Sequence, residues 1–202
     1  MFTGTNEEEM NRLEELKRIV REGNCTPGQI SKGLAVVFGV RSTEVGLMFR
    51  HEYFLKFLYP VELQSAGSIP LSGSAVAART ATSKKSDIFN NFARVPHRSI
   101  FETIKLKDSD APQPIQKLIS APVLGSNGDV VGVVQISRKG YSAREAGVDF
   151  TRDDLLRLEE VARILAPFLT KLYKPEPAPH VALKVQGERP APIVMPKTAV
   201  AS

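Results

Sequence analysis

The stretch between residues 117 and 140 constrains the fold of this chain more than any other. Two apolar runs flank Ser126-Asn127-Gly128-Asp129, and Asn-Gly between such runs is the strongest short-range signal for a β-hairpin. Because Asn and Gly both tolerate positive φ, we expect a type I′ turn at these two residues. The sequence therefore predicts two antiparallel strands joined at Asn127-Gly128.

The second arm of this hairpin, residues 130–137, is apolar at both odd and even positions. A strand with one exposed face would alternate apolar and polar residues. We therefore expect a central strand that is covered on both faces. Gly132 in its middle indicates close approach by a neighbouring element, because glycine has no side chain to hold that element away.

Composition places the chain among ordinary globular proteins, with 202 residues, 42% apolar and 24% charged. No apolar run approaches the roughly 18 residues needed to cross a membrane, and the N-terminus lacks the pattern of a secretory signal. A single cysteine, Cys25, excludes an internal disulfide and a multi-thiol metal site. We therefore expect a cytoplasmic protein with no membrane partner.

The net charge of +5 is spread along the chain in short clusters. Charge without a long basic run or a recognised binding motif does not indicate nucleic acid. We do not expect a nucleic-acid partner.

An amphipathic helix is predicted near the N-terminus, where Thr5 and Glu8 have the spacing of a capping box. Its apolar stripe is narrow and consists of Met10, Leu13, Leu16 and Val20. Two interpretations stay open: the helix docks on its own domain, or it pairs with its copy in a homodimer.

The remaining elements are predicted from caps and periodicity. We expect a helix from Thr26, strands over 44–49 and 53–59, a small-residue helix over 75–81, a short strand over 86–89 and a final helix from Thr151 that Pro167 kinks or breaks. Residues 60–71 and 90–114 read as irregular, and long irregular segments often carry function. The organisation is thus an N-terminal helix (1–24), a domain (25–173) and a Pro-rich disordered tail (174–202).

Three short motifs in this order resemble those of the GAF domain family. Residues 69–77 contain IPL followed by SAVA, similar to the family's I-P-L…S-I-A-G. Residues 120–135 contain SAPV…G…VGVVQ, similar to A-P-I…G…I-G-V-L-Q, and residues 150–155 match F-T-x-x-D-L. The resemblance covers about residues 25–172.

This resemblance implies an α/β (α+β) fold with a central antiparallel sheet of five or six strands, helices on both faces and a pocket over one face. It also implies a sensing or regulatory role in signal transduction, since such domains bind cyclic nucleotides, other small ligands, haem or bilins, or only dimerise. The N-K-x-F-D-E pattern of the cyclic-nucleotide binders is missing. No cofactor is assigned.

Catalytic groups are not evident in the sequence, which shows no nucleophile with a base, metal set or carboxylate pair at a recognisable spacing. The free methionine sulfoxide reductases share the GAF fold and rely on several cysteines, whereas Cys25 alone cannot resolve a sulfenic acid. We therefore expect the chain not to be an enzyme.

If a small ligand binds, the resemblance places it among the small-residue helix, the irregular segment and the inner face of the hairpin. Candidate ligand-binding residues are Arg79, Asn90, Asn91 and His97 as donors, Gln135 as a central polar group, and Phe89 and Phe101 as apolar walls. Each of these residues also has an interpretation without a ligand: an exposed polar side chain, a loop side chain that makes hydrogen bonds, or a part of the apolar core. Gln135 is the most informative, because a polar side chain buried in an apolar strand needs a partner.

The leading functional hypothesis is a non-enzymatic small-molecule sensor, homodimeric through its terminal helices and acting on a protein signalling partner. The alternative is a protein-interaction or dimerisation scaffold whose pocket holds no ligand.

Overall fold

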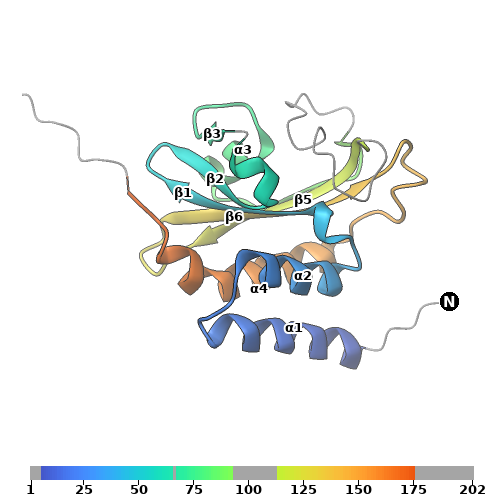
Figure 1. Cartoon of the computed structure of the whole chain (residues 1–202). Helices are drawn as coiled ribbons and strands as arrows, with labels where there is room; N and C mark the ends of the chain where they lie inside the picture. The colour runs from blue at the N-terminus through green and yellow to red at the C-terminus, as the bar shows by residue number, and fades with distance from the viewer. Residues whose placement is uncertain (1–5, 66, 93–112, 176–202) are drawn as a thin grey trace, which may run out of the picture.

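The computed structural model describes residues 6–65, 67–92 and 113–175, which form a six-stranded antiparallel sheet with helices on both faces (Figure 1). The strands are β1 (Val45–His51), β2 (Phe54–Tyr59), β3 (Ser68–Pro70), β4 (Asp87–Phe89), β5 (Ile115–Leu124) and β6 (Val130–Lys139), in the order β3-β2-β1-β6-β5-β4. The helices are α1 (Asn6–Arg21), α2 (Pro27–Phe38), α3 (Val76–Ser83) and α4 (Arg152–Thr170), with 3₁₀ turns η1 (Ser42–Glu44) and η2 (Val61–Gln64). This architecture confirms the predicted fold class.

Strand β6 lies inside the sheet between β1 and β5, as predicted. Val134 packs into the core formed with α2 and α4, whereas Val133 packs into the core under α3. A Cβ atom added at Gly132 would lie 2.3 Å from the backbone oxygen of Met48 and 2.6 Å from Cδ1 of Leu169 in α4. The predicted close approach at Gly132 is therefore confirmed, and it lets α4 pack tightly on the sheet.

The turn of the β5–β6 hairpin differs from the prediction. Gly128 has a φ of +78°, but Asn127 is not among the described residues with positive φ, so the expected type I′ turn is wrong. The amide of Gly125 donates to the oxygen of Asp129 at 2.8 Å, which closes a three-residue loop with glycine at its last position. The side-chain oxygen of Asn127 accepts from the amide of Asp129 at 3.1 Å, and such a side-chain turn needs no left-handed backbone at Asn127.

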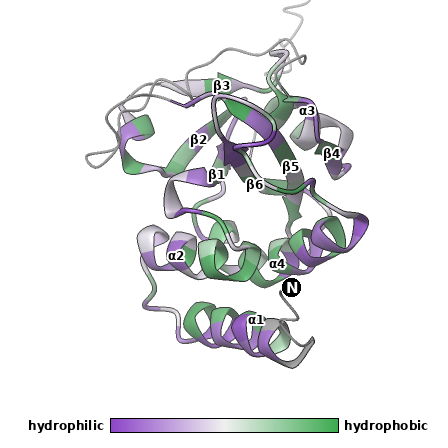
Figure 2. Cartoon of the chain, turned by 90° about the vertical axis from the view of Figure 1, so that its right-hand side faces the viewer, coloured by the Kyte–Doolittle hydropathy of each residue, from purple (hydrophilic) through white to green (hydrophobic). Residues whose placement is uncertain are grey.

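Helices α2 and α4 cover one face of the sheet and α1 lies outside them as a further layer, while α3 covers the opposite face (Figure 1). Figure 2 shows that α1 mixes hydrophilic and hydrophobic residues. Its side chain Leu16 is 1% exposed and lies over Gly33 of α2, and Lys17 makes a 3.0 Å ion pair with Glu160 of α4. The structure thus supports the docked interpretation of this helix. A homodimer stays a prediction that a single chain does not test.

One sequence expectation about regular structure is corrected and another is narrowed. Residues 60–71, expected to be irregular, contain η2 and β3, because β3 gains its order from pairing with β2. Of the two outcomes predicted at Pro167, a kink or a break, the break does not occur, because α4 continues through Pro167 to Thr170. The predicted tail lies outside the described residues except for its first two positions. None of the described helices is long and apolar enough to span a membrane.

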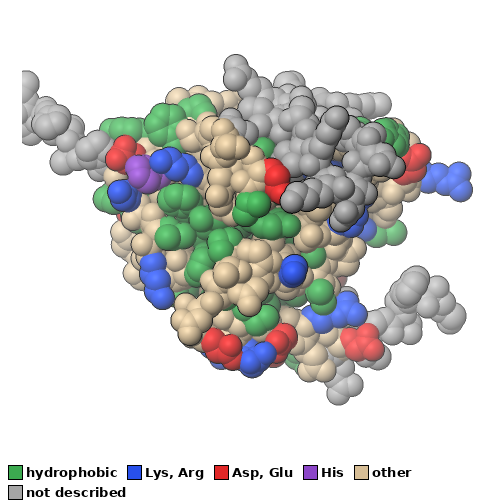
Figure 3. All heavy atoms as spheres, viewed as in Figure 1, with side chains coloured by type: hydrophobic (Ala, Val, Ile, Leu, Met, Phe, Trp, Pro, Cys, Tyr) green, Lys and Arg blue, Asp and Glu red, His purple; other side chains and the backbone are tan. Residues whose placement is uncertain are grey.

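An apolar patch lies on the molecular face where β2 meets α2. Figure 3 shows hydrophobic side chains gathered on this face. Val36 of α2 and Val61 of η2 are 56% and 54% exposed, and the half-buried Leu58 of β2 belongs to the edge of the core.

Candidate functional site

A chain of three polar side chains lies between α3 and the sheet, two of them buried and one half-buried. Thr80 of α3 is 3% exposed and Ser120 of β5 is fully buried, and their hydroxyl oxygens lie 2.7 Å apart. Gln135 of β6 donates from Nε2 to the hydroxyl oxygen of Ser120 at 3.1 Å. Three side chains from three elements therefore meet on one face in an otherwise apolar setting, and the half-buried Gln135 has a hydrogen-bond partner in Ser120.

The hairpin register brings two members of this chain together. Ser120 pairs directly with Gln135, and a bulge between Val123 and Leu124 restores the register that a two-residue turn would have produced. Ser120 could thus have been found by counting outward from Asn127-Gly128, although it was not among the predicted site residues. Thr80 could not, because its contact depends on how α3 packs over the sheet.

The sequence of α3 explains why this helix approaches the sheet closely. Ala77 and Ala81 lie one turn apart and pack against Met48 and Val133 in the core on this face. Small side chains at these positions bring the helix backbone near the strands, and Thr80 on the same helix can then reach Ser120.

Arg79 and Phe89 are brought together at the margin of this face. The guanidinium carbon of Arg79 lies 6.0 Å from the ring centroid of Phe89, at the edge of cation–π range. Phe89 also makes an edge contact with Phe92, with ring centroids 6.2 Å apart. Arg79 is exposed, so its donors face solvent and are accessible to a ligand.

The two asparagines have different surroundings. Asn90 makes two hydrogen bonds with the backbone of Phe150, which identifies it as a structural link in this conformation. Asn91 is exposed in a turn. His97 and Phe101 lie outside the described residues. Of the predicted ligand-binding residues, the structure thus groups Arg79 with Phe89 and connects Gln135 to Ser120.

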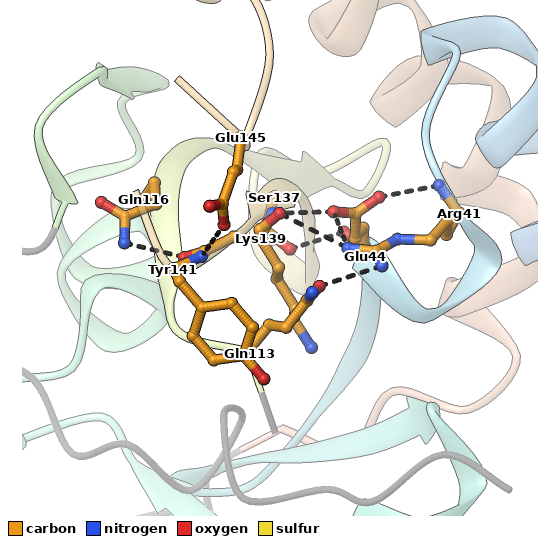
Figure 4. Close-up of polar contacts among 9 residues, drawn as sticks. Arg41, Glu44, Gln113, Gln116, Ser137, Lys139, Tyr141 and Glu145 are labelled. Atoms are coloured by element: carbon orange, nitrogen blue, oxygen red, sulfur yellow. Dashed lines mark hydrogen bonds and ion pairs between the residues drawn. The ribbon is translucent and has the colours of Figure 1, made fainter. Parts of the chain in front are cut away.

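A second polar cluster surrounds Glu44 at the start of β1 (Figure 4). Its buried carboxylate accepts hydrogen bonds from the backbone amide of Arg41 at 2.8 Å, from Nη2 of Arg41 at 2.8 Å and from the backbone amide of Lys139 at 2.7 Å. The hydroxyl of Ser137 donates to the backbone oxygen of Glu44 at 2.9 Å. Sequence analysis did not single out Glu44, because Ser137 and Lys139, two of its partners, lie on β6 and are far from it in sequence.

Two opposing effects set the pKa of Glu44. Burial would raise it, but the hydrogen bonds from Arg41 and from the amide of Lys139 outweigh burial and hold the pKa of Glu44 below its ordinary value. The carboxylate is thus kept charged, and its oxygens are engaged in hydrogen bonds with Arg41 and Lys139. This suits a structural role better than that of a proton acceptor. Within the described residues, no three His, Cys, Asp or Glu side chains gather as a metal site would require.

Comparison with known proteins defines the fold. No family model and no curated protein match the sequence. Among solved structures, the GAF domain of A. aeolicus nlh2 in an inactive state has a TM-score of 0.58 at 17% identity, covering 81% of this chain and 96% of that one. The GAF domain of an Acinetobacter phosphoenolpyruvate-protein phosphotransferase has a TM-score of 0.59 at 11% identity, covering 81% and 93%. The chain therefore has the GAF-domain fold.

A third similar structure corrects an expectation. The free methionine-R-sulfoxide reductase of Neisseria meningitidis, in complex with its substrate, has a TM-score of 0.58 at 20% identity and covers 84% of this chain and 94% of that one. Two further reductases of this kind also match. Structures similar to this chain thus include enzymes, and the expectation that the chain is not an enzyme is overturned. Cys25 is half-buried beside the core on the α2 and α4 side of the sheet.

Proposed function

We propose that this chain is a GAF-type sensing module that binds a small polar molecule against the α3 face of its sheet. The observation that carries the proposal is the polar chain Thr80–Ser120–Gln135, whose two hydroxyl residues are buried and whose glutamine is half-buried. A core built only for stability would fill this space with apolar side chains, because buried polar groups contribute little unless all their hydrogen bonds are made.

The hydrogen bonds among Thr80, Ser120 and Gln135 leave groups that a ligand can use. Thr80 and Ser120 have one hydroxyl hydrogen each, and the contact between them uses one of the two. Neither hydroxyl donates to any other residue in the described part of the chain, and Oε1 of Gln135 has no partner there either. A ligand that presents a donor would satisfy Oε1 of Gln135, which is the half-exposed member of the three.

Similar structures add support of a general kind. The Neisseria reductase binds its substrate on this fold. In the present chain, Arg79 at the margin of the α3 face could contact a negatively charged group of a ligand bound there. The alternative of an interaction scaffold has the exposed apolar side chains of Val36 and Val61 in its favour. The buried polar chain weighs against an empty, purely structural α3 face.

Native mass spectrometry of the protein purified from its own host, followed by thermal-shift screening of a small-metabolite panel, tests the proposal. We expect a retained molecule or a panel compound that raises Tm. We also expect Gln135→Leu to weaken its binding about tenfold or more, because the acceptor is lost.

Gln64→Leu is the matched control, since Gln64 bonds only the backbone oxygen of Leu58 on the exposed surface. It should bind the compound as the wild type does. Absence of any retained or stabilising compound, or equal binding by Gln135→Leu, would refute a ligand site at the α3 face.

A further inference from the structure

A pocket of about 420 Å³ opens where β6 ends and the chain turns toward α4. Arg41, Glu44, Arg138, Lys139 and Glu145 supply its charged lining, so three basic side chains face two acidic ones. Figure 4 shows Arg41 and Glu44 on one side of this region and Glu145 on the other. The volume falls within the range of about 300–1,000 Å³ that is usual for small-molecule sites.

Most of the charged groups in this pocket already have partners. Arg41 pairs with Glu44 and also donates from Nη1 to Gln113 at 3.0 Å. Glu145 accepts from the backbone amide of Tyr141 at 2.8 Å. These contacts shape the walls and leave little attraction for a cation.

Arg138 is the exception. Its Nε atom is buried and has no hydrogen-bond partner among residues 6–65, 67–92 and 113–175. Its guanidinium carbon lies over the ring of Phe150, 4.7 Å from the centroid and within cation–π range. A cation–π contact uses none of the N–H groups of the guanidinium, which are left to find acceptors.

The position of Phe150 is itself fixed. Its backbone amide and carbonyl both bond the side chain of Asn90. The ring beneath Arg138 is therefore part of the ordered body of the domain, and Arg138 is preorganised before any ligand arrives.

We propose that this pocket binds the oxyanion group of a small metabolite, a carboxylate or a phosphate, through the guanidinium of Arg138. A planar guanidinium matches two oxygens of either group with parallel hydrogen bonds. Such a ligand would supply acceptors for the guanidinium of Arg138 and would balance the excess of basic side chains in the lining. This pocket is separate from the polar side chains Thr80, Ser120 and Gln135, and the proposal does not depend on a ligand at the α3 face.

Isothermal titration calorimetry on the full chain at low ionic strength, with inorganic phosphate and citrate as separate probes, tests this site. We expect one saturable site for at least one probe. Arg138→Gln should weaken its binding about tenfold or more, because a charge-assisted bidentate contact is lost. Arg138→Lys keeps the charge but not the planar fork and should also bind more weakly.

Arg163→Gln is the matched control, because Arg163 is an exposed arginine of α4 that does not line this pocket. It removes the same charge and should leave binding unchanged. Binding of phosphate alone would assign a phosphate ligand, and binding of citrate alone a carboxylate ligand. No saturable binding of either probe, or equal weakening by Arg163→Gln, would overturn the proposal. If Arg138→Gln does not fold by circular dichroism, Arg138→Lys decides the test in its place.

Discussion

The side chain of Asn90 pairs with the backbone of Phe150 through two hydrogen bonds, one in each direction. Nδ2 of Asn90 donates to the oxygen of Phe150 at 2.9 Å, and the amide of Phe150 donates to Oδ1 of Asn90 at 2.9 Å. The two residues are 60 positions apart in sequence. This contact joins the end of β4 to the start of α4, since Thr151 caps that helix.

Replacing Asn90 by alanine should lower the free energy of unfolding by about 1–3 kcal/mol, because both backbone groups of Phe150 lose their partner. Urea denaturation measures the change. Asn91→Ala provides a neighbouring control, since Asn91 is exposed and should change stability by no more than about 0.5 kcal/mol. Equal effects from the two substitutions would contradict the importance of the Asn90–Phe150 contact.

A methyl group at position 132 should destabilise the fold. Gly132→Ala places Cβ against the backbone of Met48 and against Leu169, and relieving this overpacking should cost about 1–3 kcal/mol in thermal or urea unfolding. In Gly28→Ala the nearest heavy atom to the new Cβ lies 3.9 Å away, so this control should lose no more than about 0.5 kcal/mol. A Gly132→Ala protein as stable as the wild type would show that α4 does not pack on β6 as described.

The pKa of Glu44 predicts a specific loss of stability in acid. Its pKa is lowered in the folded state, so its contribution is fully present above the unfolded value of about 4.3 and disappears as pH falls through the folded pKa. The stability difference between wild type and Glu44→Gln should therefore be largest near neutral pH and shrink below about pH 4.3.

Urea unfolding across this pH range checks the prediction for Glu44. Glu62→Gln serves as the control, because Glu62 is exposed and its substitution should have little effect at any pH. A wild-type advantage over Glu44→Gln that does not change with pH would argue against a charged, hydrogen-bonded carboxylate.

Docking of α1 on its own chain predicts how stability depends on its apolar stripe. Leu16→Ala should cost about 2–5 kcal/mol, because the side chain is buried, and the loss should not depend on protein concentration. Met10 is 59% exposed, so Met10→Ala should change stability by less than about 0.5 kcal/mol. A loss in Leu16→Ala that varies with concentration would instead indicate that the stripe forms an interface between copies.

Features that depend on neighbouring residues were predictable from the sequence. The helices expected to start at Thr26 and Thr151 do so, and each threonine side chain caps its helix by accepting from an amide three positions on. The central place of β6 and the close approach at Gly132 followed from an apolar strand interrupted by glycine. The turn type did not follow, because Asn-Gly fits both a two-residue loop and the end of a three-residue loop.

Features that depend on distant partners were not predictable. Thr80 and Ser120 are 40 positions apart, and nothing local to either residue indicates that their hydroxyls meet. Nothing in the sequence distinguishes Glu44 from other glutamates, because the amide of Lys139 reaches it only when β6 pairs with β1. For the same reason Asn90 was expected at a ligand, whereas its amide is engaged by Phe150.

The outermost strands of the sheet, β3 and β4, have only three residues each. Pro70 gives β3 one amide fewer to donate, and the exposed Asp87 places a charge on β4. Short, interrupted and charged strand edges are poor templates for another chain. Edge-to-edge aggregation of native copies is therefore disfavoured by the strands themselves, even in concentrated solution.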